Sequence, residues 1–212
     1  PASGKEQVKS RRPATESATR LQILNSAITR FAYAGYRGVS MRDVAAAVGI
    51  SAAALYHHFP DKQALYLAAM EYAFARNEEG IVKMLKSDLP PLERLAIFVE
   101  RFTALVARDE EFGKLVQREL LDGDAVRMEL LNEKVFRKPR EAIVALAREL
   151  VTDLDPYLFA DSLIGMVLSN YQLAPLRRNV QGEVAATDRA KAIARHITAL
   201  ITRAVSRPDS SV

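Results

Sequence analysis

The chain contains no cysteine, which excludes disulfide bonds, thiolate catalysis and redox sensing through thiols. No apolar run approaches the ~18 residues that span a bilayer, and the start of the sequence has no hydrophobic signal core. Histidine is scarce: His57 and His58 are adjacent, and His196 stands alone. We therefore expect a soluble, cytoplasmic protein with no membrane segment.

The motifs that would indicate an enzyme are also missing. The histidines form no metal-spaced cluster, and there is no G-x-S-x-G element or phosphate-binding loop. The pairs Glu110-Glu111 and Asp122/Asp124 are explained as solvated charges near helix N-terminal ends, where the helix dipole favours them. We predict no catalytic residue, no metal site and no cofactor; scattered carboxylates leave a helical enzyme as the weaker alternative.

Charge is distributed unevenly along the 212 residues, of which 49% are hydrophobic. Residues 1–62 hold 9 Lys/Arg against 4 Asp/Glu, whereas residues 63–212 hold 21 against 22. The whole basic excess therefore lies in the first part of the chain. This asymmetry is typical of a phosphate-binding surface and predicts an affinity that falls steeply with added salt, although a merely soluble surface would also account for it.

The chain begins with a basic segment. Residues 1–15 are rich in Lys, Arg, Ser, Pro and Ala and predict a disordered arm. Such arms can follow a minor groove, but a solvated tail is the interpretation we favour. An amphipathic helix is expected over residues 16–34, ended by Gly35, because apolar residues recur there at three- and four-residue spacing.

Two short helices around a tight turn are predicted in residues 35–62, G-Y-R-G-V-S-M-R-D-V-A-A-A-V-G-I-S-A-A-A-L-Y-H-H-F-P-D-K. Ser40 and Asp43 form an S-x-x-D pair that can cap a helix running to about Val48. Gly49 suits the reversal that follows, since glycine enters left-handed backbone conformations cheaply. This arrangement is typical of a helix-turn-helix DNA reader.

The second short helix, residues 52–58, follows Ser51, which is placed to cap it. Ala53 or Ala54, together with Leu55, is expected to face the core. Tyrosine and histidine offer hydrogen bonds to phosphate, and alanine methyl groups can touch a thymine methyl, although an aromatic pair at a helix end is also common packing. The residues expected to point outward are Ala52, Tyr56 and His57, with His58 near the helix end.

The pattern G-Y-x-x-V-S-M-R-D-V-A-x-x-V-G-I-S-x-x-x-L-Y-H-H-F-x-D-K-x-x-L resembles the DNA-binding signature of the TetR family of bacterial transcriptional regulators. The match covers about residues 19–73, roughly a quarter of the chain. The resemblance implies an all-α fold, with a three-helix DNA-binding domain followed by a larger helical ligand-binding and dimerisation domain. We expect these at residues 16–61 and 62–206, with a tail at 207–212.

The resemblance also implies which residues contact double-stranded DNA. It assigns DNA contacts to the aromatic positions of the second short helix, and phosphate contacts to Lys62 at the start of the next helix. Residues 52–54 are alanines where many relatives have a lysine, glycine or polar residue, so we expect sparse base hydrogen bonding and greater use of Arg42 and DNA shape. The full expected set is Ser40, Arg42, Ser51, Ala52, Tyr56, His57, His58 and Lys62.

Beyond Asp61 the pattern is uniformly helical. Helices are expected at about 62–86, 91–108, 109–121, 125–151 with an interruption near Lys138-Pro139, 155–178 and 183–205. The last helix has an apolar face that consists of Ile193, Ile197, Leu200, Ile201 and Ala204. The helix before it carries small residues at a spacing that would let another helix approach closely, namely Ser162, Gly165 and Ser169.

A homodimer is expected because one short helix reads only about three or four base pairs, too few against the ~10⁶ competing sites of a genome. The family resemblance places the dimer interface in the last two helices. The alternative is that their apolar face packs within one chain.

The C-terminal part contains material for a ligand pocket. Aromatic and methionine side chains, Phe112 and Phe136 among them, favour a hydrophobic or amphipathic small-molecule effector of unknown identity, and polar residues in apolar helices need partners that a ligand or another helix could supply. The expected ligand-binding residues are Phe98, Phe102, Thr103, Gln117, Met128, Met166, Asn170 and Tyr171.

These features together predict a dimeric repressor that a ligand releases from a palindromic operator, through movement of the helix that begins at Lys62. A DNA-binding dimer that responds to no ligand is the alternative within the same family.

Overall fold

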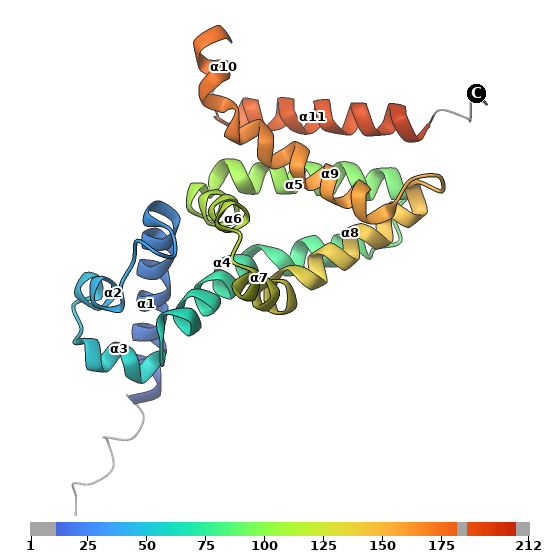
Figure 1. The fold of residues 1–212 in the computed structure, drawn as a ribbon. Coiled ribbons are helices and arrows are strands. Elements are labelled where there is room, and N and C mark those ends of the chain that lie inside the picture. The colour runs from blue at the N-terminus through green and yellow to red at the C-terminus, as the bar shows by residue number, and fades with distance from the viewer. Residues whose placement is uncertain (1–11, 182–185, 207–212) are drawn as a thin grey trace, which may run out of the picture.

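The computed structural model describes residues 12–181 and 186–206, and within these ranges every regular element is helical (Figure 1). The elements are α1 (Arg12–Ala34), α2 (Met41–Val48), α3 (Ala52–His58), α4 (Lys62–Leu85), α5 (Pro91–Arg108), α6 (Glu110–Asp122), α7 (Ala125–Leu131), the π-helical turn η1 (Asn132–Phe136), α8 (Arg137–Leu150), α9 (Pro156–Gln172), α10 (Ala174–Gln181) and α11 (Ala186–Val205). The all-α fold class expected from the sequence is confirmed. In the described ranges, no helix combines the length and apolar character needed to cross a bilayer.

Local caps fix the helix-turn-helix segment as the sequence predicts. The backbone N–H of Asp43 donates to the Ser40 hydroxyl at 3.2 Å, and the Ser40 N–H donates to the Asp43 carboxylate at 2.8 Å. Gly49 adopts φ 77°, in the left-handed region, where α2 ends. The Ser51 hydroxyl then accepts from the N–H of Ala54 at 3.1 Å and starts α3. The predicted limits of both short helices are therefore confirmed.

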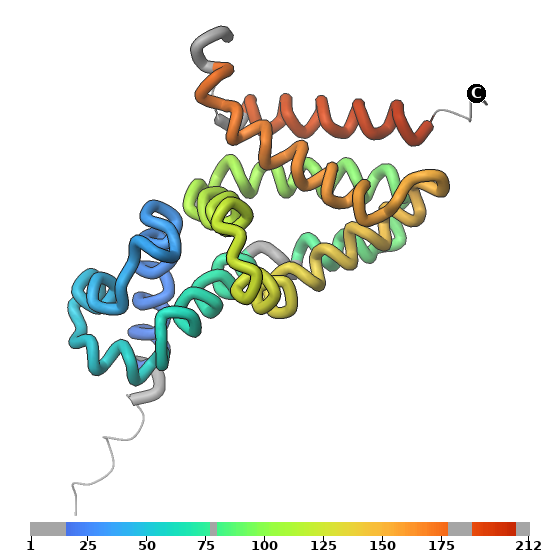
Figure 2. The backbone as a smooth tube through the Cα atoms, viewed as in Figure 1, coloured from blue at the N-terminus to red at the C-terminus, as the bar shows by residue number. Residues whose placement is uncertain are grey.

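The helix α4 leads from this segment into the rest of the molecule, where α5, α8, α9 and α11 pack together (Figure 1). The backbone trace in Figure 2 shows α6 and α7 between the two groups of helices. Helix α6 packs against α1, and α7 packs against α4. Helices α6 and α7 thus lie where the N-terminal and C-terminal parts meet.

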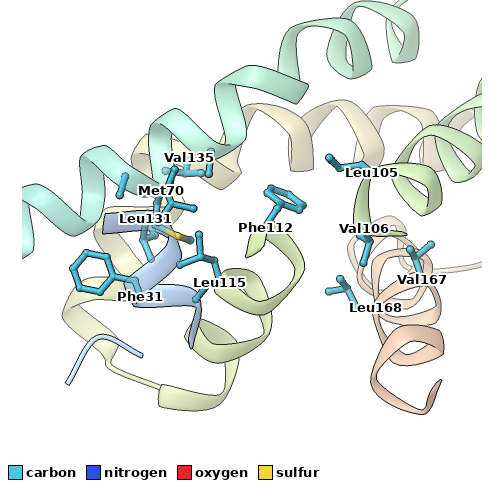
Figure 3. Close-up of a cluster of buried hydrophobic side chains, with 14 of the residues drawn as sticks. Phe31, Met70, Leu105, Val106, Phe112, Leu115, Leu131, Val135, Val167 and Leu168 are labelled. Atoms are coloured by element: carbon cyan, nitrogen blue, oxygen red, sulfur yellow. The ribbon is translucent and has the colours of Figure 1, made fainter. Parts of the chain in front are cut away.

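The hydrophobic core continues across this junction (Figure 3). Phe31 of α1, Met70 of α4, Leu115 of α6 and Leu131 of α7 are all buried in one cluster. Such close-packed contacts resist independent movement of either part. The predicted division after residue 61 stays a prediction, and the packing makes α4, α6 and α7 common to both parts.

Helix ends differ from the sequence prediction at three places. Helix α1 begins at Arg12, so only residues 1–11 of the predicted arm lie outside the described residues, as does the tail 207–212. The predicted interruption near Pro139 takes the form of the π turn directly before it. The helix predicted to reach residue 178 is split after Gln172, where Pro175 supplies no backbone donor. Helix α11 is described from Ala186, and its predicted start at residue 183 lies outside the described ranges.

The apolar stripe of α11 differs more from expectation. Ile193, Ile197 and Ile201 are buried within the chain, where α11 lies along α5. Leu200 and Ala204 are exposed on the same helix. The stripe therefore serves mainly as an intrachain contact, which was the alternative left open by the sequence.

Candidate functional site

Helix α3 presents an exposed surface that includes aromatic side chains. Tyr56 is 50% exposed and His57 is exposed, whereas His58 is half-buried, with its ring centroid 6.0 Å from that of His57. Ala53 and Ala54 are both exposed, so the expectation that one of them faces the core is wrong.

The reason for that error is helical spacing. Leu55 is buried, and the residues one turn away on its face are Ala52, which is half-buried, and Phe59, which is buried. The outward surface of α3 is therefore formed by Ala53, Ala54, Tyr56 and His57. Its methyl groups and polar aromatic rings are suited to contact with base edges and phosphates.

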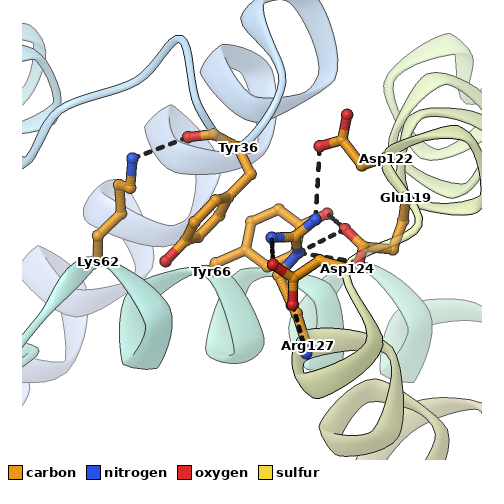
Figure 4. Close-up of polar contacts among 7 residues, drawn as sticks. All are labelled: Tyr36, Lys62, Tyr66, Glu119, Asp122, Asp124 and Arg127. Carbon is orange, nitrogen blue, oxygen red and sulfur yellow. Dashed lines mark hydrogen bonds and ion pairs between the residues drawn. The ribbon is translucent and has the colours of Figure 1, made fainter.

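The other predicted DNA-binding residues occupy different environments. Arg42 is exposed on α2, and Ser40 and Ser51 are exposed at the starts of α2 and α3, where both hydroxyls accept helix N–H groups. Lys62 is half-buried: its Nζ donates to the carbonyl oxygen of Tyr36 (Figure 4) and to that of Val39, both at 3.0 Å. Two of its three donors thus hold the loop between α1 and α2, and its phosphate contact stays a prediction.

A cavity of about 460 Å³ lies between α4, α5, α6, α7, η1, α8 and α9. This volume is within the usual range of small-molecule sites. Five phenylalanines and several aliphatic side chains form its walls: Phe74, Phe98, Phe102, Phe112, Phe136, Ile81, Leu105, Val116, Leu120, Ile143, Ile164 and Leu168. The interior is therefore suited to an apolar group.

Three of the eight residues predicted to bind ligand line this cavity, namely Phe98, Phe102 and Met128. The other five, Thr103, Gln117, Met166, Asn170 and Tyr171, are not among the lining residues. Phe112 and Phe136, part of the aromatic inventory in the sequence, do line it.

Hydrogen bonds within and between helices account for several of the five. The Tyr171 hydroxyl donates to the Thr103 carbonyl at 2.7 Å, and burial raises the pKa of Tyr171 to about 12. The Asn170 amide donates to the Met166 carbonyl at 2.8 Å and accepts from Arg177 at 2.9 Å. These polar groups already have protein partners, which was the alternative to a ligand contact.

The sequence analysis missed the polar rim of the cavity, which consists of Glu129, Asn132, Arg140 and Asp161. Nη2 of Arg140 lies 3.0 Å from each carboxylate oxygen of Asp161, joining α8 to α9. Charged residues at these positions are typical of any solvated helix face. No local pattern in the sequence distinguishes them, because helix packing alone brings them to one opening.

A buried polar network joins α4, α6 and α7 (Figure 4). Nε of Arg127 on α7 donates to both oxygens of Glu119 on α6 at 2.8 and 2.9 Å, and the Tyr66 hydroxyl on α4 donates to Glu119 at 2.6 Å. Burial and this hydrogen bond raise the pKa of Tyr66 above its ordinary value near 10. The guanidinium of Arg127 also lies 4.4 Å from the centroid of the Tyr36 ring.

A second contact joins α6 to the end of α1. Arg118 donates through Nε to the carbonyl of Ala32 at 2.8 Å and through Nη2 to that of Tyr33 at 2.7 Å. These carbonyls belong to the last turn of α1, where carbonyl groups have no hydrogen-bond partner within the helix. The negative end of the helix dipole also favours a cation there. Gly35 follows with φ 72°, and a Cβ there would lie 3.4 Å from Arg118.

Comparison with known proteins identifies the family. Residues 23–69 match the family described as bacterial regulatory proteins, tetR family. The transcriptional repressor AcnR of Corynebacterium diphtheriae is 31% identical over 153 residues, which cover 67% of this chain and 80% of that protein. The chain belongs to the TetR family. AcnR of Corynebacterium efficiens is 33% identical over 120 residues, which cover 53% of this chain and 64% of that protein, slightly under two thirds.

Solved structures share the fold of this TetR-family chain along most of its length. FadR from Bacillus subtilis in complex with stearoyl-CoA has a TM-score of 0.70 at 16% identity. AibR in complex with isovaleryl coenzyme A and operator DNA has a TM-score of 0.68 at 24% identity. Each match covers 84% of this chain and 97% of the other.

The family match and the cavity concern different parts of the TetR-family chain. Residues 23–69 contain every residue predicted to contact DNA, from Ser40 to Lys62. All residues that line the cavity lie beyond them, between Phe74 and Leu168. The chain is therefore a transcriptional regulator by family, while its effector must be argued from the cavity.

Proposed function

We propose that this TetR-family regulator is a dimeric repressor, and that an apolar or amphipathic small molecule in the cavity releases it from a palindromic operator. The observation that supports this most directly concerns α6 and α7. These helices contribute Val116, Leu120 and Met128 to the cavity, and they contribute Glu119 and Arg127 to the contacts with α4 and the DNA-binding part. The same two helices therefore meet both sites.

DNA recognition rests on the exposed surface of α3. Tyr56 and His57 can donate to phosphates and stack, and the methyl groups of Ala53 and Ala54 fit against thymine methyls. Arg42 on α2 is exposed and adds a positive charge beside this surface. Few side chains on α3 can make bidentate contacts to bases, so DNA shape supplies part of the specificity.

The dimer is proposed through the exposed sides of α9 and α11. On α9, Leu158, Ser162 and Gly165 are exposed along one stripe, and a Cβ at Gly165 would meet no described atom within 4 Å. On α11, Leu200 is 46% exposed. Small residues let helix backbones approach closely, and the family resemblance places the interface at these helices. Two recognition helices one duplex turn apart, about 34–36 Å, would read an inverted repeat.

The effector is proposed from the walls of the cavity. Its aromatic and aliphatic lining favours an apolar body, and the charged rim favours a polar end. Two proteins of the same fold, FadR and AibR, hold stearoyl-CoA and isovaleryl coenzyme A, both of which combine an acyl chain with a polar group. This likeness supports an amphipathic ligand.

Coupling between the sites is proposed through α4, α6 and α7 together. A ligand that displaces α6 or α7 would move Arg118 relative to α1, and Glu119 relative to Tyr66. Either movement would turn the DNA-binding part and change the separation of the two α3 helices. Linkage then requires that DNA weaken ligand binding by the same factor by which the ligand weakens DNA binding.

Selection of bound duplexes from a random DNA pool tests the proposal. We expect an enriched inverted repeat with the natural protein, none with Tyr56→Ala, and normal enrichment with Tyr33→Ala, whose tyrosine is equally exposed on α1. Absence of any enriched sequence with the folded natural protein would contradict DNA recognition by α3. If ligands that demonstrably bind the cavity leave operator affinity unchanged, the dimer is a regulator without an effector.

A further inference from the structure

Arg140 at the rim of the cavity has one buried donor without a partner in the described part of the chain. Its Nη2 pairs with Asp161, whereas its Nε is buried and has no hydrogen-bond partner among the described residues. Buried donors in proteins almost always have partners, so this atom calls for an explanation. A ligand group at the rim that accepts a hydrogen bond would supply one.

The charges around Arg140 limit what this acceptor can be. The rim contains one guanidinium and two carboxylates, those of Asp161 and Glu129, and the amide of Asn132 adds no charge. A ligand carboxylate placed beside Arg140 would meet repulsion from both acidic side chains. A neutral carbonyl oxygen can accept the Nε hydrogen without that penalty.

The interior limits the rest of the ligand. At about 30 Å³ per non-hydrogen atom, the volume of a water molecule in the liquid, the cavity of about 460 Å³ holds about 15 such atoms. Most of the lining residues are phenylalanine and aliphatic side chains. A single unbranched chain of about ten carbons with its carbonyl at the rim satisfies both limits.

We propose that the effector is a medium-length apolar chain ending in a neutral carbonyl group, as in an ester, amide or thioester, and that Arg140 Nε donates to that carbonyl. This inference rests on the proposed effector role of the cavity and adds the chemical class of the ligand. Asp161 has a positioning role, because its pair with Nη2 fixes the guanidinium at the rim.

Three probes of nearly equal size test the acceptor: methyl decanoate, decyl methyl ether and decanoate, each titrated calorimetrically below its micelle concentration. We expect the ester to bind the natural protein at least tenfold more tightly than the ether, since a hydrogen bond from a charged donor is worth about that factor or more. Decanoate is expected to bind more weakly than the ester.

Matched variants connect this preference to Arg140. Arg140→Met keeps the volume and Arg140→Lys keeps the charge, but neither has the Nε donor, so the ester-to-ether ratio should fall to near one in both. Arg137→Met, at an exposed position of α8 that does not line the cavity, should keep the ratio of the natural protein. Circular dichroism establishes that each variant is folded.

The outcomes separate this inference from the proposed function. Equal binding of ester and ether by the natural protein would leave the cavity as a ligand site but overturn the role of Arg140. Tighter binding of decanoate than of the ester would show that the acceptor is a carboxylate. Failure of all three probes to bind would overturn both this inference and the effector cavity, while operator selection would still test DNA binding on its own.

Discussion

Arg127 of α7 and Glu119 of α6 form an ion pair at 2.8 Å in which the two side chains are only 6% and 1% exposed. Burying two charges is costly, and here the cost is offset by several hydrogen bonds, including that from the Tyr66 hydroxyl to the same carboxylate. The pair joins α6 and α7 at the point where they contact the DNA-binding part.

Removal of one member of this pair should strongly destabilise the protein. We expect Arg127→Met to lower the free energy of unfolding by about 3–5 kcal/mol, because it leaves the buried Glu119 carboxylate without its cation. Glu119→Gln should cost less, because Arg127 keeps its ion pairs with Asp122 at 3.4 Å and Asp124 at 3.6 Å. The double variant Glu119→Leu/Arg127→Met should lose much less than the sum. Urea denaturation measures these differences, and Glu110→Gln, which breaks the exposed pair with Lys114, is a control with little expected effect. Additive losses would mean that the two charges are not coupled.

Arg118 should govern the response to ligand more than the affinity for DNA. Arg118→Met removes the donors to the last carbonyls of α1, so movement of α6 should be transmitted less completely. The factor by which a bound ligand weakens operator binding, typically 5–150 in coupled systems, should shrink severalfold while ligand affinity stays the same. Fluorescence anisotropy with labelled operator, with and without ligand, measures this factor. An unchanged factor would exclude this route of coupling.

Acid should weaken the contact between α5 and α8. A hydrogen bond from the buried Arg94 lowers the pKa of Glu149 below its ordinary value of 4.5. A carboxyl whose pKa is lowered on folding stabilises the protein above its unfolded pKa and loses that contribution as pH falls through the folded pKa. At pH 6–7, Glu149→Gln should therefore have a lower free energy of unfolding than the natural protein. The difference should be about 1 kcal/mol or less because Glu149 is partly exposed, and it should vanish at low pH. Glu133→Gln, at an exposed position, should show no such pH dependence.

Arg42 should contribute to DNA affinity through charge. Its side chain is exposed on α2, and Arg42→Gln removes one positive charge from the proposed DNA-binding surface. If Arg42 contacts a phosphate, operator affinity should fall and the magnitude of its slope against salt concentration should decrease by about 1 on logarithmic axes. Filter binding or anisotropy across a salt series measures the slope. A weaker affinity with unchanged slope would instead indicate contact with a base.

The sequence determined the helix-turn-helix part in detail because its signals are local. The Ser40–Asp43 capping box, the left-handed Gly49 and the Ser51 cap each act within four residues along the chain, and each could be identified from spacing. The exception was the orientation of α3, where three consecutive alanines give no contrast between the core face and the exposed face.

The tertiary structure decided what depends on residues far apart in the sequence. It placed three of the eight predicted ligand residues at the cavity and gave Thr103, Asn170 and Tyr171 protein partners. It also buried the α11 stripe against α5. An apolar or charged residue on a helix carries the same sequence signal whether it meets another helix, a second subunit or a ligand. The packing of the helices selects among these, and here it brought Arg140 and Asp161 together at one opening.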